Sequence, residues 1–195
     1  MLKAIQHSGG TGMTEWFWYF VLYSFVGFLL EVLFARATGN PKRDRKCHLF
    51  LPLCPVYGLG AVLILLLPPA VLANPLLLFF CGSLVATAAE YAMAVVYHYA
   101  AGVDFWNYSH LPLQLGGRVC LLFSGLWGLL ALGLMSLIQP WASVLLPAIP
   151  LWATLPAAAL VAADAALTFY VLRRERTTDA LRWYLHLGQK REQAS

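Results

Sequence analysis

Long apolar runs, separated by short polar segments, dominate this chain of 195 residues. A helix of about 20 apolar residues crosses the hydrocarbon core of a bilayer, and five segments reach or approach that length. We expect helices at roughly 15–36, 50–71, 75–99, 117–138 and 150–172. The pattern therefore predicts an all-α fold, a polytopic bundle of about five transmembrane helices.

The composition supports a membrane protein and indicates its domain organisation. Hydrophobic residues make up 61% of the chain and charged residues only 11%, so little sequence remains for a soluble domain. We expect a disordered segment at 1–13, a membrane domain at 14–172 and a basic cytoplasmic tail at 173–195. The tail contains either a short helix on the membrane surface or an ordinary solvated segment. The net charge of +4 suits contact with membrane lipids rather than nucleic acid.

The basic residues indicate how the chain crosses the membrane. With five spans, all of the 13 Lys and Arg residues except Lys3 fall on one side. They are Arg36, Lys42, Arg43, Arg45, Lys46, Arg118, Arg173, Arg174, Arg176, Arg182, Lys190 and Arg191. Such residues gather in the cytoplasmic loops of membrane proteins. We therefore expect the N-terminus outside and the C-terminus in the cytoplasm.

Three acidic residues, Glu31, Glu90 and Asp164, interrupt the apolar runs. An ionised carboxylate in a bilayer is costly, so such residues normally face a bundle interior or a wet cavity. Counted at 1.5 Å per residue, all three lie roughly 7–14 Å from the cytoplasmic boundary. A converging set could bind a cation, carry protons or hold the head of an amphipathic substrate. The alternative is a buried hydrogen-bond network that fixes helix packing, and Asp164 in particular could simply cap a neighbouring helix.

The two loops on the cytoplasmic side supply further candidates. The Pro-rich stretch at 52–55 makes the start of the second helix irregular, and non-helical backbone at that depth must be covered by protein or line a cavity. We expect Tyr57 and Asp104 to line the inner mouth of the site. Arg118 opens the fourth helix, where a charge so close to an apolar segment usually has an acidic partner.

Motifs for catalysis and cofactor binding are missing from the sequence. No Ser-His-Asp or Cys-His nucleophile set stands out, and the phosphate loop G-x-x-x-x-G-K-[ST] is absent. Cys47-His48 and Cys54-Pro55 raise the idea of a metal, yet a metal site needs three or four ligands at suitable spacing. We therefore assign no catalytic residue, metal or cofactor, and we expect the four cysteines to be reduced.

Several separated motifs resemble one bacterial family. In order they are Tyr23-Ser24-Phe25-Val26-Gly27 with Glu31, Leu51-Pro52-Leu53-Cys54-Pro55-Val56-Tyr57-Gly58, Glu90-Tyr91, Trp106-Asn107-Tyr108-Ser109 and Gly117-Arg118-Val119-Cys120-Leu121 with Trp127-Gly128. Together they resemble the membrane family described as putative ABC-transporter type IV, or CmpB-like permeases. The resemblance implies a permease-like role in the bacterial inner membrane without naming a substrate. It carries over Glu31, Tyr57, Glu90 and Arg118 position by position.

We interpret the chain as an integral membrane protein with a transport-related role, whose intramembrane carboxylates form a polar site in the inner half of the bundle. Coupling to protons or cations is a hypothesis that rests on those acids. A first alternative is a membrane enzyme acting on a lipid or isoprenoid, which predicts a lipid-sized groove beside Glu31 and Glu90. A second is a scaffold or regulator with a closed core. Five short spans are few for a transport path, so we expect a homodimer or a complex, with any ATPase as a separate subunit.

Overall fold

The computed structural model describes residues 12–39 and 47–182, and most of this part is helical. The principal helices are α1 (Gly12–Ala37), α2 (Pro55–Leu65), α3 (Pro69–Leu72), α4 (Pro75–Val96), α5 (Leu121–Gly133), α6 (Gln139–Leu145) and α7 (Leu151–Glu175). The π-helical turns η2 (Tyr97–Ala101) and η3 (Leu134–Ile138) extend α4 and α5, and the 3-10 turns are η4 (Leu146–Ala148) and η5 (Thr178–Arg182). The strands β1 (Gln114–Leu115) and β2 (Val119–Cys120) form an antiparallel hairpin.

Four helical segments are long and apolar enough to cross a membrane. They are Gly12–Ala37, Pro75–Ala101, Leu121–Ala148 and Leu151–Glu175. These segments match the first, third, fourth and fifth predicted helices and confirm the all-α membrane bundle. Residues 1–11 and 183–195 of the predicted terminal segments lie outside the described part.

The predicted helix at 50–71 is wrong in its bounds. Residues 47–54 are irregular, and α2 has only 11 residues, which span about 17 Å at 1.5 Å per residue. Pro52 and Pro55 explain the late start, because proline lacks an N–H and restricts the residue before it. Most of the irregular segment is buried, as non-helical backbone within a membrane requires.

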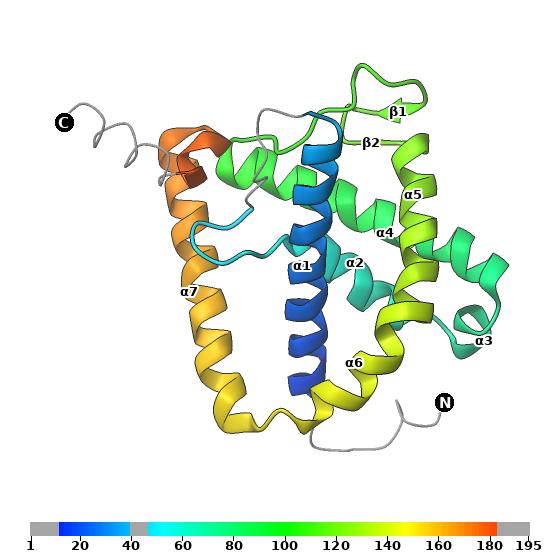
Figure 1. Ribbon diagram of the computed structural model, residues 1–195. Coiled ribbons are helices and arrows are strands. Elements are labelled where there is room, and N and C mark those ends of the chain that lie inside the picture. The colour runs from blue at the N-terminus through cyan, green and yellow to red at the C-terminus, as the bar shows by residue number, and fades with distance from the viewer. Residues whose placement is uncertain (1–11, 40–46, 183–195) are drawn as a thin grey trace.

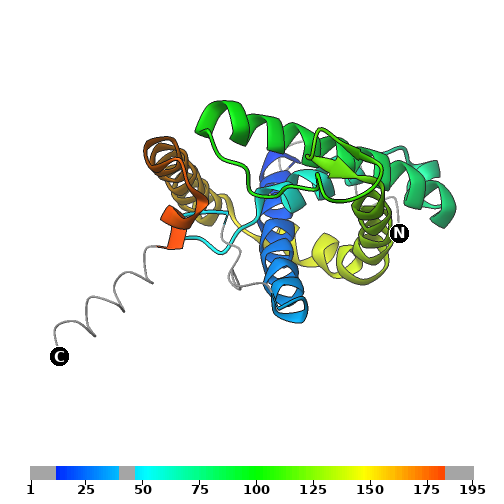
Figure 2. The same ribbon diagram turned by 90° about the horizontal axis from the view of Figure 1, so that it is seen from above.

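Helices α1, α2, α4 and α5 pack in that order. Helix α2 lies between α1 and α4, and α4 packs against α5. Helices α1 and α5 both stand on the same side of α4 (Figures 1 and 2). Gly58 allows close contact of α2 with α1, because a Cβ there would overlap the Ser24 hydroxyl and the Phe20 carbonyl. Tyr23 of α1 donates a hydrogen bond to Gln139 of α6.

Helix α7 stands at one side of the bundle (Figure 2). Near its start Thr154 accepts a hydrogen bond of 2.9 Å from the Trp18 indole of α1. Near its end Leu172 is fully buried, in a cluster with Tyr97 and Val103. Most of the rest of α7 is exposed, which suits a helix that faces lipid.

The C-terminal end of α1, the β1–β2 hairpin and η5 gather at one end of the molecule, at the top of Figure 1. We call this the inner end. The described basic residues in or next to these elements are Arg36, Arg118, Arg173, Arg174, Arg176 and Arg182. Helix α1 begins at the opposite end. In the predicted orientation this inner end faces the cytoplasm.

Candidate functional site

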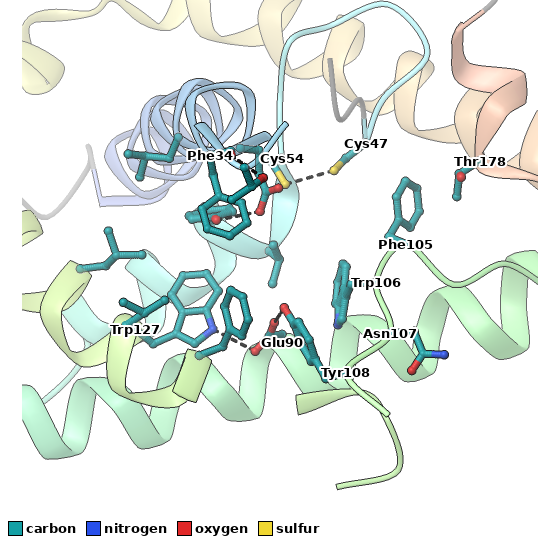
Figure 3. A pocket seen from close by; sticks show the side chains of 18 of the residues that line it. Phe34, Cys47, Cys54, Glu90, Phe105, Trp106, Asn107, Tyr108, Trp127 and Thr178 are labelled. Atoms are coloured by element: carbon teal, nitrogen blue, oxygen red, sulfur yellow. Dashed lines mark hydrogen bonds between the residues drawn. The ribbon is translucent and has the colours of Figure 1, made fainter. Parts of the chain in front are cut away.

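A cavity of about 720 Å³ lies between α1, α2, α4 and α5 towards the inner end. Three of the predicted site residues, Glu31, Tyr57 and Glu90, line it. Figure 3 shows Glu90 beside Tyr108 and Trp127 in this cavity. The structure therefore brings two of the three intramembrane acids to one place.

Glu31 is held by a tyrosine at the start of α2. The Tyr57 hydroxyl donates a hydrogen bond of 2.8 Å to Oε1 of Glu31. Gly27 lies one turn before Glu31 on α1, and a Cβ at this glycine would overlap the Tyr57 ring. The absence of a side chain at Gly27 thus allows the ring to lie against α1 and reach the carboxylate.

Glu90 is almost completely buried, with 4% of its surface exposed. Its Oε1 accepts a hydrogen bond of 2.9 Å from the Tyr108 hydroxyl, and its Oε2 accepts one of 2.9 Å from the Trp127 indole. Burial, and then the charge of Glu90, raises the pKa of Tyr108 far above its usual range, so the phenol remains a donor. Two donors facing both oxygens suit an ionised carboxylate, which only accepts hydrogen bonds.

The two glutamates belong to one polar cluster. The Tyr57 ring that binds Glu31 lies 4.8 Å, centroid to centroid, from the Trp127 ring that binds Glu90. Both carboxylates line the same cavity. Two like charges in such a place favour the uptake of a cation or a proton. The cluster is thus suited to hold a positively charged group.

One wall of the cavity is apolar and reaches the outer surface of the bundle. Leu30 and Phe34 of α1, together with Leu126 and Leu129 of α5, line this wall. Phe34, Leu126 and Leu129 are 45%, 39% and 57% exposed, so they border both the cavity and the surface that faces lipid. Nearer the inner end the rings of Phe34 and Phe123 meet edge to face, 6.2 Å apart. The cavity therefore combines an acidic interior with an apolar side.

The inner mouth of the cavity carries polar groups that were not among the predicted site residues. Asn107 and His110 line it from the segment before β1, and η5 contributes Thr178, Asp179 and Arg182. Arg182 Nη1 lies 3.9 Å from Asp179 Oδ1. The mouth thus bears charges of both signs, whereas the interior bears the two glutamates.

Asp164 lies away from the glutamates and does not line the cavity. Its carboxylate accepts hydrogen bonds from the backbone N–H groups of Phe50, at 3.1 Å, and Leu51, at 2.8 Å. His48 Nδ1 lies 3.2 Å from the same carboxylate. Burial lowers the pKa of His48, while the Asp164 charge opposes that effect. Asp164 therefore fastens the irregular turn at 48–51 to α7, a capping role rather than a place in the acidic cluster.

Arg118 and Asp104 also lie outside the lining of the cavity. The Arg118 guanidinium stands over the Tyr91 ring, 5.9 Å from its centroid, and the exposed Asp104 pairs with His98 at 3.1 Å. In the part of the chain that the structure describes, Arg118 forms no ion pair with the acids considered above. The predicted charge balance by Arg118 is therefore not seen there.

Sequence reasoning missed the two donors to Glu90. Tyr108 resembles a member of an ordinary aromatic belt at a membrane interface, and Trp127 stands out only as part of the Trp-Gly pair in the family resemblance. The sequence did hold a clue, because a buried carboxylate needs hydrogen-bond donors. An indole or phenol at the same depth in the membrane as Glu90 can supply them. Which aromatic residues donate to the Glu90 carboxylate depends on how the segment before β1 folds back onto the helices.

Comparisons with known proteins place the chain in a family. No curated protein and no solved structure matches it. The sequence profile of one family, described as "Putative ABC-transporter type IV", matches residues 18–171. This range covers α1 from its second turn to the last turns of α7, and includes both glutamates of the cavity. The chain belongs to this family of transport-related, multi-pass membrane proteins.

Proposed function

We propose that the chain is a permease-like subunit of the bacterial inner membrane, and that the cavity at Glu31 and Glu90 is its substrate site. The observation that carries the proposal is the joining of two carboxylates to an apolar wall in one cavity of about 720 Å³. A cationic head would lie between the glutamates, and an apolar body would lie along α1 and α5. The substrate class is thus an amphipathic organic cation.

Charge and burial favour a cation over a neutral or anionic ligand. Glu90 is buried and its two donors, Tyr108 and Trp127, are neutral groups. A buried carboxylate gains most when a positive partner reaches it. Exchange of a proton bound by these glutamates for the substrate cation would couple transport to protons, which is the hypothesis that the sequence suggested. The phosphate-loop motif is absent from the sequence, so we place any ATP hydrolysis on a separate ATPase subunit.

Binding of a matched pair of ions tests the site. Tetraphenylphosphonium and tetraphenylborate have nearly the same size and opposite charge, and both can be titrated against the purified protein in nanodiscs. We expect the phosphonium to bind more tightly, and Glu31→Gln and Glu90→Gln each to weaken it roughly tenfold or more, as removal of one partner of a buried charge pair does. Asp104→Asn, an exposed acid outside the cavity, is the control and should bind like the wild type.

The proposal fails if both glutamine variants bind the phosphonium like the wild type, or if the borate binds equally well. Movement across the membrane needs a separate measurement. Uptake of ethidium, a poorly permeant organic cation, into proteoliposomes should depend on Glu31 and Glu90 and on pH. Unchanged uptake in both variants would refute transport through this site.

The apolar wall also favours a second candidate, an enzyme that acts on a membrane lipid. Phe34, Leu126 and Leu129 reach the lipid-facing surface, as a groove for a lipid requires. Incubation of the wild type with labelled phospholipids or isoprenoid phosphates tests this candidate, and a product that Glu90→Gln fails to form would favour it over transport. The scaffold alternative predicted a closed core, and the open cavity argues against it.

A further inference from the structure

Two cysteine side chains lie next to each other in the wall of the cavity. Cys47 Sγ and Cys54 Sγ are 3.1 Å apart, and both residues line the cavity (Figure 3). They are buried, with 8% and 2% of their surface exposed. The cavity is the route by which a small molecule could reach these sulfur atoms.

The backbone between the two cysteines is fixed on both sides. Towards α7, Thr168 accepts a hydrogen bond of 2.9 Å from the Leu49 N–H, next to the bonds that Asp164 accepts. Towards α1, the Cys54 N–H donates a hydrogen bond of 2.9 Å to the Ser24 carbonyl. The turn 47–54 therefore holds its first and last side chains together, although seven positions separate them.

We propose that Cys47 and Cys54 are a redox-active dithiol that a small-molecule disulfide converts to an intramolecular disulfide, closing the turn in the cavity wall. A disulfide bond is about 2.05 Å long, so the sulfurs must approach by about 1 Å, which side-chain rotation can supply. The inference stands apart from the proposed function, because it depends on the two sulfurs and not on what the cavity binds.

The reaction proceeds in two balanced exchanges. One cysteine loses its proton, and its thiolate attacks the small-molecule disulfide, giving a mixed disulfide and releasing one small thiolate. The second cysteine then loses its proton and attacks the protein sulfur of that mixed disulfide, releasing the other small thiolate. The two protons end on the two released thiols. Two protein thiols are oxidised and one small disulfide is reduced.

The surroundings favour an intramolecular product over a stable mixed disulfide. The second sulfur already lies 3.1 Å from the first, so its attack needs no rearrangement of the backbone. In the predicted orientation the turn belongs to the cytoplasmic half, where thiol pools keep cysteines reduced. The dithiol is therefore the resting form, and the disulfide forms when the pool becomes oxidised.

The test uses the full-length protein in nanodiscs with oxidised glutathione as the oxidant. The other two cysteines, Cys81 and Cys120, lie outside the lining of the cavity, and a Cys81→Ser/Cys120→Ser background leaves only the pair. We expect the intact mass to fall by two hydrogen atoms, both thiols to become unreactive towards a maleimide, and dithiothreitol to restore them. In Cys47→Ser or Cys54→Ser the single remaining thiol should stop at the mixed disulfide.

A second measurement works on the wild-type chain, and so covers the case in which the serine background does not fold. Chymotrypsin cleaves after Phe50, between the two cysteines, and leaves the fragments joined only by the disulfide. Recovery of the joined fragments after oxidation, and their separation by dithiothreitol, is the expected result. A stable glutathione adduct on Cys47 or Cys54 would overturn the proposal. So would two thiols that stay reactive towards a maleimide under conditions in which oxidised glutathione consumes the thiols of the unfolded protein.

Discussion

Replacing Asp164 by asparagine should loosen the turn at 48–51 without changing the size of the side chain. The carboxylate accepts the N–H groups of Phe50 and Leu51 and contacts His48. An amide keeps one accepting oxygen and puts an NH₂ group where the other oxygen was. One backbone N–H then faces a donor instead of an acceptor, in a place where only 3% of Asp164 is exposed.

The expected size of the effect follows from those contacts. A hydrogen bond to a charged acceptor contributes about 1.5–3 kcal/mol, so losing one should speed local opening, and with it amide exchange, roughly 10- to 150-fold. Thr168→Val removes the neutral bond from Leu49, worth about 1 kcal/mol, and should speed exchange roughly fivefold. Asp164→Asn should therefore have the larger effect, at Phe50 and Leu51, and Thr168→Val the smaller, at Leu49.

Hydrogen–deuterium exchange of peptides covering 47–53, measured in nanodiscs, is the assay. Asp104→Asn is the matched control, because that carboxylate is exposed and pairs with His98 away from the turn. If Asp164→Asn and the control show the same exchange in these peptides, the carboxylate does not hold the turn. Faster exchange throughout α7 instead of in the turn would equally refute a local capping role.

Two further predictions concern pH and packing. Burial holds the pKa of His48 below its ordinary value of 6.5, so the folded turn binds fewer protons than the opened turn. The stability of the turn is therefore complete above pH 6.5 and decreases as the pH falls through that value towards the lowered pKa. Hydrogen–deuterium exchange, corrected for the intrinsic rate, should show this pH dependence in the wild type and not in His48→Gln. Gly27→Ala should displace the Tyr57 ring, which should lower the free energy of unfolding by about 1–3 kcal/mol and weaken phosphonium binding. In the control Gly125→Ala a new Cβ meets nothing within 4 Å, so thermal unfolding and phosphonium titration should both match the wild type.

Four of the five predicted membrane segments are confirmed, because length and uninterrupted apolar character suffice to identify a helix that can span a membrane. The prediction failed for 50–71, where the run is equally apolar but contains prolines at both ends of α2. Hydropathy measures the preference for lipid and carries no information on backbone hydrogen bonds. The prolines decide the local structure, and the chain crosses this region as an irregular turn followed by a short helix.

For the site, the depth of each acidic residue in the membrane could be predicted from the sequence, but the direction in which its side chain points could not. Counting residues from the inner ends of the helices placed Glu31, Glu90 and Asp164 in one layer. Whether a side chain at that depth points to a common centre depends on how each helix is rotated against its neighbours. Glu31 and Glu90 lie on helices that flank α2, whereas Asp164 lies on α7 and faces the turn. The position of Tyr108 depends on the fold of a loop and had no periodic signal.

The irregular turn explains why an acid at Asp164 is tolerated in an apolar helix. A continuous helix satisfies its own N–H groups, but the turn at 47–54 leaves several that need acceptors from elsewhere. Asp164 and Thr168 accept three of them from one side. The same turn ends at Cys54, the cap of α2, and three residues later Tyr57 binds Glu31. The turn therefore binds α7 at one end, through Asp164 and Thr168, and at its other end leads into α2, whose Tyr57 positions Glu31.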